Sequence, residues 1–159
     1  MKKLIFICFI FLFPKLFYGQ EINSNERIKK IDLLVKVTDS IGITQKEGIA
    51  EGEIKYNHTR VFFGWEAYFV NDTKNRPLRI RYSETNPKSN ENLNLYYQNG
   101  EPIFIVLIET PIIQKSKNNK QIIKQFYLDD NKIIYPETNN SDKIYVLEKE
   151  KTIRKMIYH

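Results

Sequence analysis

Cysteine and histidine are nearly absent from this sequence of 159 residues. The one cysteine, Cys8, lies in an apolar N-terminal run, and the two histidines are His58 and the terminal His159. Zinc sites need His or Cys ligands, and Asp129-Asp130-Asn131 lacks the following glycine and glutamate of a calcium-binding loop. We therefore expect no metal and no cofactor.

Glycine is also scarce, and none of the six glycines forms a phosphate-binding loop. No serine lies in a Gly-x-Ser-x-Gly elbow, and His58, the one histidine suited to act as a base, falls in a polar segment before a strand. The chain has no recognisable catalytic motif, so we expect it not to be an enzyme. The alternative is a small hydrolase that relies on the carboxylates Glu51, Glu53 and Glu66.

The N-terminal residues have the layout of a secretory signal peptide. Two lysines precede an apolar run at positions 4–13, Pro14 ends this run, and Gly19 offers a small residue for cleavage. A bilayer-spanning helix needs about 20 apolar residues, so we expect cleavage and no stable membrane anchor afterwards. An uncleaved anchor is the alternative. The predicted organisation is a signal peptide over residues 1–19 and one domain over residues 20–159, located in the periplasm or outside the cell.

A strong charge of one sign is missing too. The whole chain has 25 basic and 19 acidic residues, and the loss of three lysines with the signal leaves 22 basic residues and a net charge of +3. Nucleic-acid binding needs a basic stripe with stacking aromatics, so this balance and the export signal argue against a nucleic-acid partner. The mature chain also lacks cysteine, so a packed core must stabilise it in place of disulfides.

The mature chain is predicted to open with an amphipathic helix. Apolar residues recur at helical spacing over residues 28–41, and Asp39 lies outside this stripe. Gly42 suits the position that follows a helix, so we expect the helix to stop there. From about residue 49 the pattern changes to the period of two that is typical of strands.

Five to seven strands follow, and the segments between them favour an antiparallel meander. Asn99-Gly100 suits a type I′ hairpin turn, whose two central residues both need a positive φ. Residues 129–131 separate a second pair of strand-like segments. Gly64 indicates a bulge within one strand, and residues 84–92 are expected to form a polar loop.

The C-terminal residues favour a second helix. Ser141 fits an N-cap, and apolar residues recur from position 144 to position 157. The charged run at residues 148–151 interrupts this stripe, so a strand followed by a tail is the alternative. The predicted fold class is α+β, an antiparallel meander with a helix at its N-terminal end and this second helix at the other.

Three strand ends share an aromatic pair, one further residue and then Asn or Asp. They are Tyr68-Phe69-Val70-Asn71, Tyr96-Tyr97-Gln98-Asn99 and Phe126-Tyr127-Leu128-Asp129. These hairpins resemble those of small uncharacterised exported proteins of bacterial cell envelopes, which pair an N-terminal helix with a meandering sheet. Tyr96, Tyr97, Asn99 and Gly100 also resemble the Tyr-Tyr-x-Asn-Gly hairpin of variant MORN-type repeats, whose other glycines are absent here. The resemblance implies this fold and no particular activity.

The strand at residues 103–108 is apolar on both faces, unlike its neighbours. A helix can cover one face, and then either the sheet curls over the other or an apolar patch waits for a partner or ligand. The leading hypothesis is an exported, non-enzymatic binding or interaction protein of the cell envelope with an unknown protein partner. A carrier that holds a small apolar ligand on the concave sheet face is the alternative. The candidate interaction residues are Trp65, Arg79, Arg81, Tyr96 and Phe104.

Overall fold

The computed structural model describes residues 24–56, 60–112, 120–137 and 139–158. The signal peptide expected at residues 1–19 lies outside these ranges. The chain divides into two units, Met1–Leu34 and Val35–His159, and the division falls within a helix at residues 24–44. The second unit contains the sheet and the C-terminal helix. No helix in the described ranges is long and apolar enough to cross a bilayer.

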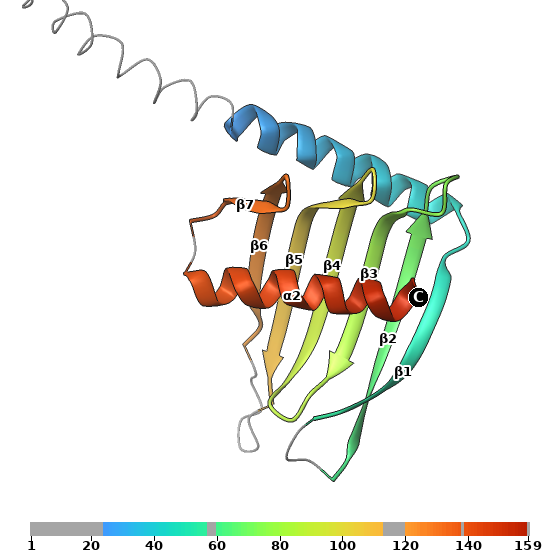
Figure 1. The fold of residues 1–159 in the computed structure, drawn as a ribbon, viewed down its shortest axis with the longest axis vertical. Coiled ribbons are helices and arrows are strands. Elements are labelled where there is room, and N and C mark those ends of the chain that lie inside the picture. The colour runs from blue at the N-terminus through green and yellow to red at the C-terminus, as the bar shows by residue number, and fades with distance from the viewer. Residues whose placement is uncertain (1–23, 57–59, 113–119, 138, 159) are drawn as a thin grey trace, which may run out of the picture. The chain divides into compact units, whose positions relative to one another are not determined.

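Seven strands form one antiparallel sheet, and their order in space is their order in sequence (Figure 1). The strands are β1 (Gly48–Lys55), β2 (Phe62–Asn71), β3 (Pro77–Thr85), β4 (Ser89–Gln98), β5 (Glu101–Pro111), β6 (Ile122–Asp129) and β7 (Lys132–Tyr135). The helix α2 (Asn140–Ile157) follows and runs across the strands. The predicted α+β meander with a helix at each end is thereby confirmed.

The hairpin turns follow from residues that tolerate a positive φ. Asn99 has φ 56° and Gly100 has φ 87°, which is the backbone conformation expected of a type I′ turn. Asp130 and Asn131, with φ 48° and 61°, join β6 to β7 in the same way. Their side chains are short and polar, so the left-handed region costs these residues less than it costs others.

The N-terminal helix does not stop at Gly42, contrary to the prediction. Residues 24–44 are helical, and the Arg79 guanidinium lies directly against Gly42. A Cβ added at Gly42 would stand 2.0 Å from Nη2 of Arg79. This glycine therefore permits the close approach of a side chain and does not end the helix.

The predicted polar loop at residues 84–92 is mostly strand. β3 continues to Thr85 and β4 begins at Ser89, so the turn between them is short. Glu84 and Glu91 lie directly opposite each other in the ladder, and both are buried. Burial of polar side chains is tolerated where hydrogen bonds satisfy them, and a hydrophobicity pattern does not report such bonds. Gly64 also differs from its prediction, because it stays in register opposite Glu53 without a bulge.

The second helix is confirmed, with a different cap. Asn139 is the N-cap in place of Ser141, and its side chain accepts a hydrogen bond of 2.9 Å from the Asp142 backbone N–H. The charged residues at 148–151 do not interrupt the helix. Lys149 and Glu150 turn toward the sheet, where each has an oppositely charged or hydroxyl partner.

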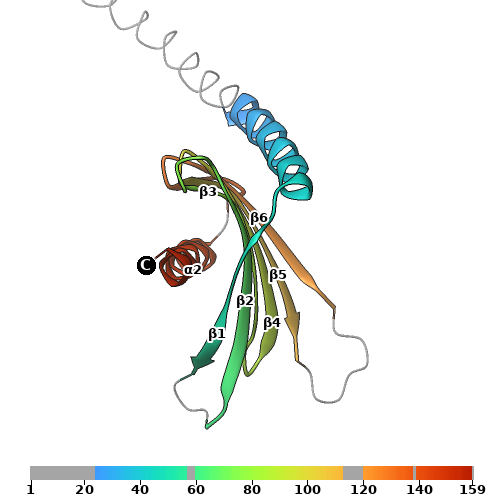
Figure 2. The ribbon, with the colours of Figure 1, turned by 90° about the vertical axis from the view of Figure 1, so that its right-hand side faces the viewer.

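The core lies between α2 and the concave side of the sheet, which bends around the helix (Figure 2). Val146 and Ile153 of α2 are fully buried against inward-facing residues of the strands. These strand residues are Ala67, Ile80, Tyr82, Leu93, Leu95, Tyr97, Ile105, Leu107, Phe126 and Leu128. Alternate residues of each strand therefore supply one continuous apolar layer, as a half-covered antiparallel sheet requires.

The convex side of the sheet has two different parts. Over β4 to β7 an aromatic row crosses the strands, with ring centroids 5.8 Å apart for Tyr96 and Phe104 and 4.6 Å apart for Phe104 and Tyr127. Tyr135 continues the row at 6.0 Å from Tyr127. Phe104 is 7 % exposed, so the outer face of β5 offers no open apolar patch at this point. Over β1 to β4 the convex side is mainly polar, with Ile49 and Phe62 exposed among the polar residues, and the candidate site lies there.

Glu150 is an ionisable residue inside the core, where its side chain is 2 % exposed. Its carboxylate accepts a hydrogen bond from Tyr97 Oη at 3.1 Å and lies 3.4 Å from Nε of Arg154. Burial raises the pKa of Glu150 above its usual value, although Arg154 and Tyr97 act in the opposite direction. A carboxyl with a raised pKa favours the folded state below its ordinary pKa and loses this contribution as the pH rises through the folded value.

Glu150→Gln is therefore expected to increase the free energy of unfolding at neutral pH. This advantage over the wild type should shrink as the pH falls and Glu150 becomes protonated. Glu150→Ala serves as the control and should cost about 1–3 kcal/mol, because it leaves the Tyr97 hydroxyl and Arg154 without their acceptor. Urea denaturation across the acidic to neutral range measures both, and a glutamine variant that is less stable at neutral pH would contradict the burial cost.

Candidate functional site

The five interaction residues predicted from the sequence do not form one exposed patch. Trp65 lies on the α2 side of the sheet, half-buried and stacked on Tyr82 with ring centroids 5.9 Å apart. Tyr96 and Phe104 are buried in the aromatic row of the convex side. The structure brings Arg79 and Arg81 together with Tyr96 on that side, and separates Trp65 from them.

Arg79 holds residues of the N-terminal helix and the following segment against the sheet. Its Nη1 lies 2.7 Å from Oδ1 of Asp39, and its Nη2 lies 2.8 Å from Oε1 of Glu47. Tyr96 Oη also donates to Asp39 at 3.1 Å. Arg81 pairs with Glu47 and lies over the Tyr68 ring. Asp39 therefore faces the sheet, and these basic residues are occupied by internal partners.

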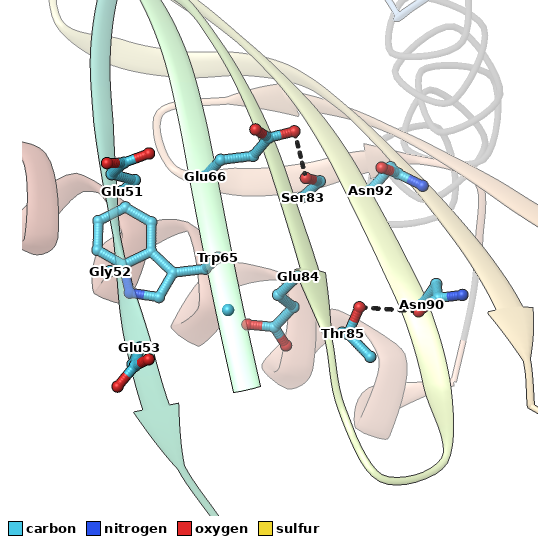
Figure 3. Close-up of a pocket in the computed structure, with 11 residues that line it drawn as sticks. Glu51, Gly52, Glu53, Trp65, Glu66, Ser83, Glu84, Thr85, Asn90 and Asn92 are labelled. Atoms are coloured by element: carbon cyan, nitrogen blue, oxygen red, sulfur yellow. Dashed lines mark hydrogen bonds between the residues drawn. The ribbon is translucent and has the colours of Figure 1, made fainter. Parts of the chain in front are cut away.

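A polar cleft lies on the convex side at the β1 edge of the sheet (Figure 3). It encloses about 580 Å³ and is open to solvent. Its walls come from β1 to β4, and Figure 3 shows carboxylate, hydroxyl and amide groups crossing these strands. The lining residues are Glu51, Gly52, Glu53, Gly64, Trp65, Glu66, Ser83, Glu84, Thr85, Asn90 and Asn92. The missing side chain of Gly64 leaves this space open, because nothing lies within 4 Å of a Cβ built there.

Three exposed carboxylates lie close together in this cleft. Glu51 is directly opposite Glu66 in the β1–β2 ladder, and Glu53 is opposite Gly64 on the same face. Opposed residues have Cβ atoms about 4.5–5.5 Å apart, and like charges in such positions destabilise a sheet. The Ser83 hydroxyl donates to Glu66 at 3.2 Å and the Tyr68 hydroxyl at 3.4 Å.

No basic side chain of the described chain pairs with these three carboxylates. Lys55, on the same face of β1 as Glu53, lies over the Phe62 ring at 5.6 Å, and Arg81 pairs with Glu47. In the described ranges, no group of three or more His, Cys, Asp or Glu residues is arranged to hold a metal ion. The cleft therefore presents three carboxylates without an ion-pair partner in the described chain to solvent.

A second polar cluster lies on the concave side, beneath α2, and its members bond to one another. Glu84 accepts hydrogen bonds from Tyr56 at 2.9 Å and Tyr82 at 2.6 Å, and it forms an ion pair with Lys149. Glu91 accepts from Asn86 at 2.7 Å and also from Tyr145. These bonds join α2 to β3 and β4. We therefore interpret this cluster as one that stabilises the packing of α2 on the sheet.

Sequence reasoning identified Glu51 and Glu53 as a pair on one strand face and Glu66 separately, as candidates for hydrolysis, and did not identify the cleft. The alternation of Glu51 and Glu53 on one strand was visible, but their approach to Glu66 depends on the β1–β2 register. Ser83 was placed on the wet face of a strand without a functional role, and Thr85, Asn90 and Asn92 were assigned to a loop. Their period of two from Ser83 to Thr85 and from Asn90 to Asn92 was the available signal.

Comparison with known proteins does not identify a family for this chain. The chain matches no family model, and no curated protein or solved structure shows significant similarity to it.

Proposed function

We propose that this chain is an exported, non-enzymatic binding protein of the bacterial cell envelope, and that the convex-side cleft binds a positively charged partner. One observation carries the proposal. Glu51, Glu53 and Glu66 share a cleft without a basic counterpart in the described chain. Sequences normally avoid like charges opposite each other in a ladder, and such local conflicts are concentrated at functional sites. A basic partner would relieve this repulsion on binding.

The shape of the cleft favours a macromolecule over a small apolar ligand. Eight of its eleven lining residues are charged, hydroxyl or amide residues, and it is open to solvent, whereas sites for small molecules are lined mostly by apolar side chains and enclose their ligand. The concave face, which an apolar ligand would occupy, carries α2 and the core. The charged rim and its hydroxyl and amide groups suit a wet, polar interface with a protein.

The stability of a charge-neutralised variant tests the first half of this proposal. Glu51→Gln, Glu53→Gln and Glu66→Gln combined should raise the free energy of unfolding by about 0.2–1 kcal/mol for each like-charge contact removed. The matched control replaces three exposed glutamates elsewhere, Glu26, Glu137 and Glu148, and changes the net charge equally. Denaturation in urea at low salt measures the difference, and equal stabilities of the two variants would contradict local repulsion.

Partner capture tests the second half. The full chain with a C-terminal tag is crosslinked in its own envelope fraction, and the captured proteins are quantified by mass spectrometry. We expect a basic partner at stoichiometric yield, lost in the Glu51/Glu53/Glu66 variant and retained in the control variant. Capture should weaken with salt, because exposed charges are screened beyond about 8–10 Å at ordinary ionic strength. Equal capture by both variants would refute the cleft as the binding site.

A second function, carboxylate-dependent hydrolysis of a glycan, is favoured by one observation. Glu51 and Glu66 are direct cross-strand neighbours on one face, and such enzymes place two carboxyl groups on either side of the bond they cleave. However, that chemistry needs one protonated and one ionised carboxyl, set apart by unlike environments. Both residues here are exposed on one polar face. Release of reducing ends from envelope glycan, abolished by Glu66→Gln alone, would decide for hydrolysis.

A further inference from the structure

The sheet has one long open edge, formed by β1. β1 pairs with β2 over all eight of its residues without a register shift, and no strand of the described chain lies on its other side. β7 at the opposite edge has four residues. In an antiparallel edge strand about half of the backbone N–H and C=O groups point away from the sheet, where another strand can pair with them.

The two faces of β1 differ in chemistry. The residues on the convex side are Ile49, Glu51, Glu53 and Lys55, and the two carboxylates lie at the middle of the strand, opposite Glu66 and Gly64 of β2. The residues on the concave side begin with Gly48, Ala50 and Gly52, which are small. A strand that added to this edge would therefore meet acidic groups on one face and a recess beside small residues on the other.

Aromatic rings of β2 fill that recess and reach the edge. A Cβ at Gly48 would lie 2.3 Å from a ring carbon of Phe69, and a Cβ at Gly52 would lie 2.8 Å from Nε1 of Trp65. Both rings are half-buried, and Figure 3 shows the Trp65 ring beside Gly52 on β1. The two glycines thus allow Trp65 and Phe69 to offer apolar surface next to the open backbone edge.

We propose that an extended segment of the partner pairs with β1 as an additional strand, with alternating basic and apolar side chains. Its Lys or Arg residues lie over Glu51, Glu53 and Glu66, and its apolar residues lie against Trp65 and Phe69. The inference rests on the proposed function and specifies how that partner binds. Main-chain pairing supplies the affinity in such complexes, and the alternate side chains supply the specificity.

Charge selects this occupant over a second copy of the chain. Pairing β1 with β1 of another copy would bring the carboxylates Glu51 and Glu53 of both chains onto one surface that already has uncompensated charge. Like charges across a ladder oppose association, whereas alternating cations neutralise the cleft. The same carboxylates therefore act against self-association and in favour of a basic strand.

Synthetic peptides of eight residues, matching the length of β1, test the inference on the full chain. The first alternates Lys and Val, and the second has the same composition with its lysines grouped at one end. Two further peptides keep the alternating sequence. One carries N-methyl groups on the backbone nitrogens of its Lys residues, and the other carries them on the backbone nitrogens of its Val residues. Trp65 is the single tryptophan of the chain, so its fluorescence reports binding at this edge.

We expect the alternating peptide to bind at least about tenfold more tightly than the grouped one, because only alternation places all cations on one face. One of the two methylation patterns should weaken binding by at least about tenfold, since it removes the N–H groups that face β1. Hydrogen exchange of the β1 amides should slow in the complex, with β7 unchanged as the internal control. The Glu51/Glu53/Glu66 glutamine variant should lose binding of the alternating peptide.

The outcomes separate the two proposals. Equal binding of all four peptides, lost in the glutamine variant, would overturn strand addition and leave a basic partner at the cleft. If no peptide binds, or if the peptides bind the glutamine variant as tightly as the wild type, both proposals are overturned. The carboxylates would then serve to keep other strands from pairing with the β1 edge. Dimerisation through β1 in sedimentation experiments would assign the edge to a second copy and overturn the inference.

Discussion

Glu84→Ala is expected to destabilise the chain by about 3–5 kcal/mol, because it leaves a buried ammonium group without its carboxylate. The Glu84 side chain is 2 % exposed, and that of Lys149, its ion-pair partner, is 16 % exposed. Glu84 is also the acceptor for the hydroxyls of Tyr56 and Tyr82. One substitution therefore removes three interactions that join α2, β3 and the segment after β1. Urea denaturation at neutral pH measures the loss.

Two further variants isolate the role of the charge. Glu84→Gln keeps the shape and one acceptor oxygen, so it should fall between the wild type and Glu84→Ala. Adding Lys149→Met to Glu84→Ala removes the orphaned cation and should recover part of the lost stability, which gives a non-additive double-mutant cycle. A cost of less than about 1 kcal/mol for Glu84→Ala would show that water reaches Lys149 and that the pair is not the anchor of α2.

Unfolding at alkaline pH is the second large effect that we expect. Six tyrosines have a raised pKa with burial as the largest cause: Tyr56, Tyr82, Tyr96, Tyr97, Tyr145 and Tyr158. The pKa rises to about 12 for Tyr96 and Tyr158. Carboxylates that accept their hydrogen bonds add to the shift at all but Tyr158.

The sign of the effect follows from the direction of these shifts. A group whose pKa is raised by folding stabilises the folded state fully below the unfolded pKa, about 10 for tyrosine, and loses this contribution as the pH rises. Tyr82 and Tyr97 are 2 % and 3 % exposed, so both remain un-ionised while the chain is folded. Each phenol then removes about 1.4 kcal/mol per pH unit above pH 10. Two pH units cost about 5 kcal/mol from this pair alone, which is comparable to the stability of a small domain.

Parallel records of tyrosinate absorbance and far-ultraviolet circular dichroism against pH test this expectation. Most of the tyrosinate signal should appear together with the loss of secondary structure. Tyr97→Phe removes one phenol while preserving the ring, so its loss of stability above pH 10 should be less steep than that of the wild type. Full ionisation of the phenols in a chain that keeps its native dichroism would contradict the buried network.

The local sequence pattern was sufficient to predict most helices, strands and turns. It was insufficient to predict the polar contacts between them. The alternation in β1 and β3, the continuous apolar run of β5, the Asn99-Gly100 turn and the apolar spacing of α2 all depend on residues that are close in sequence. The prediction failed at residues 84–92 because Glu84 and Glu91 are polar and yet buried. Lys149, which pairs with Glu84, is 65 positions away in the chain, and no periodicity reports such a partner.

The candidate site shows the same division. Glu51, Glu53 and Glu66 could be chosen as carboxylates from the sequence, whereas their meeting in one cleft required the β1–β2 register. Arg79 was expected at an exposed surface, but Asp39 and Glu47 from the N-terminal helix and the segment after it occupy its guanidinium. Gly42 was expected to end a helix, and instead it makes room for that guanidinium.

The sequence by itself determined that this chain forms an antiparallel meander with flanking helices, because strand period, turn residues and helical spacing are local properties. It also determined which side chains share a strand face, since alternate residues point the same way. The tertiary structure decided which strands became edges, which charges found partners and which did not. Those outcomes depend on register and on contacts between residues far apart in the chain, so the open edge of β1 and the meeting of Glu51 and Glu53 with Glu66 of β2 are properties of the folded sheet.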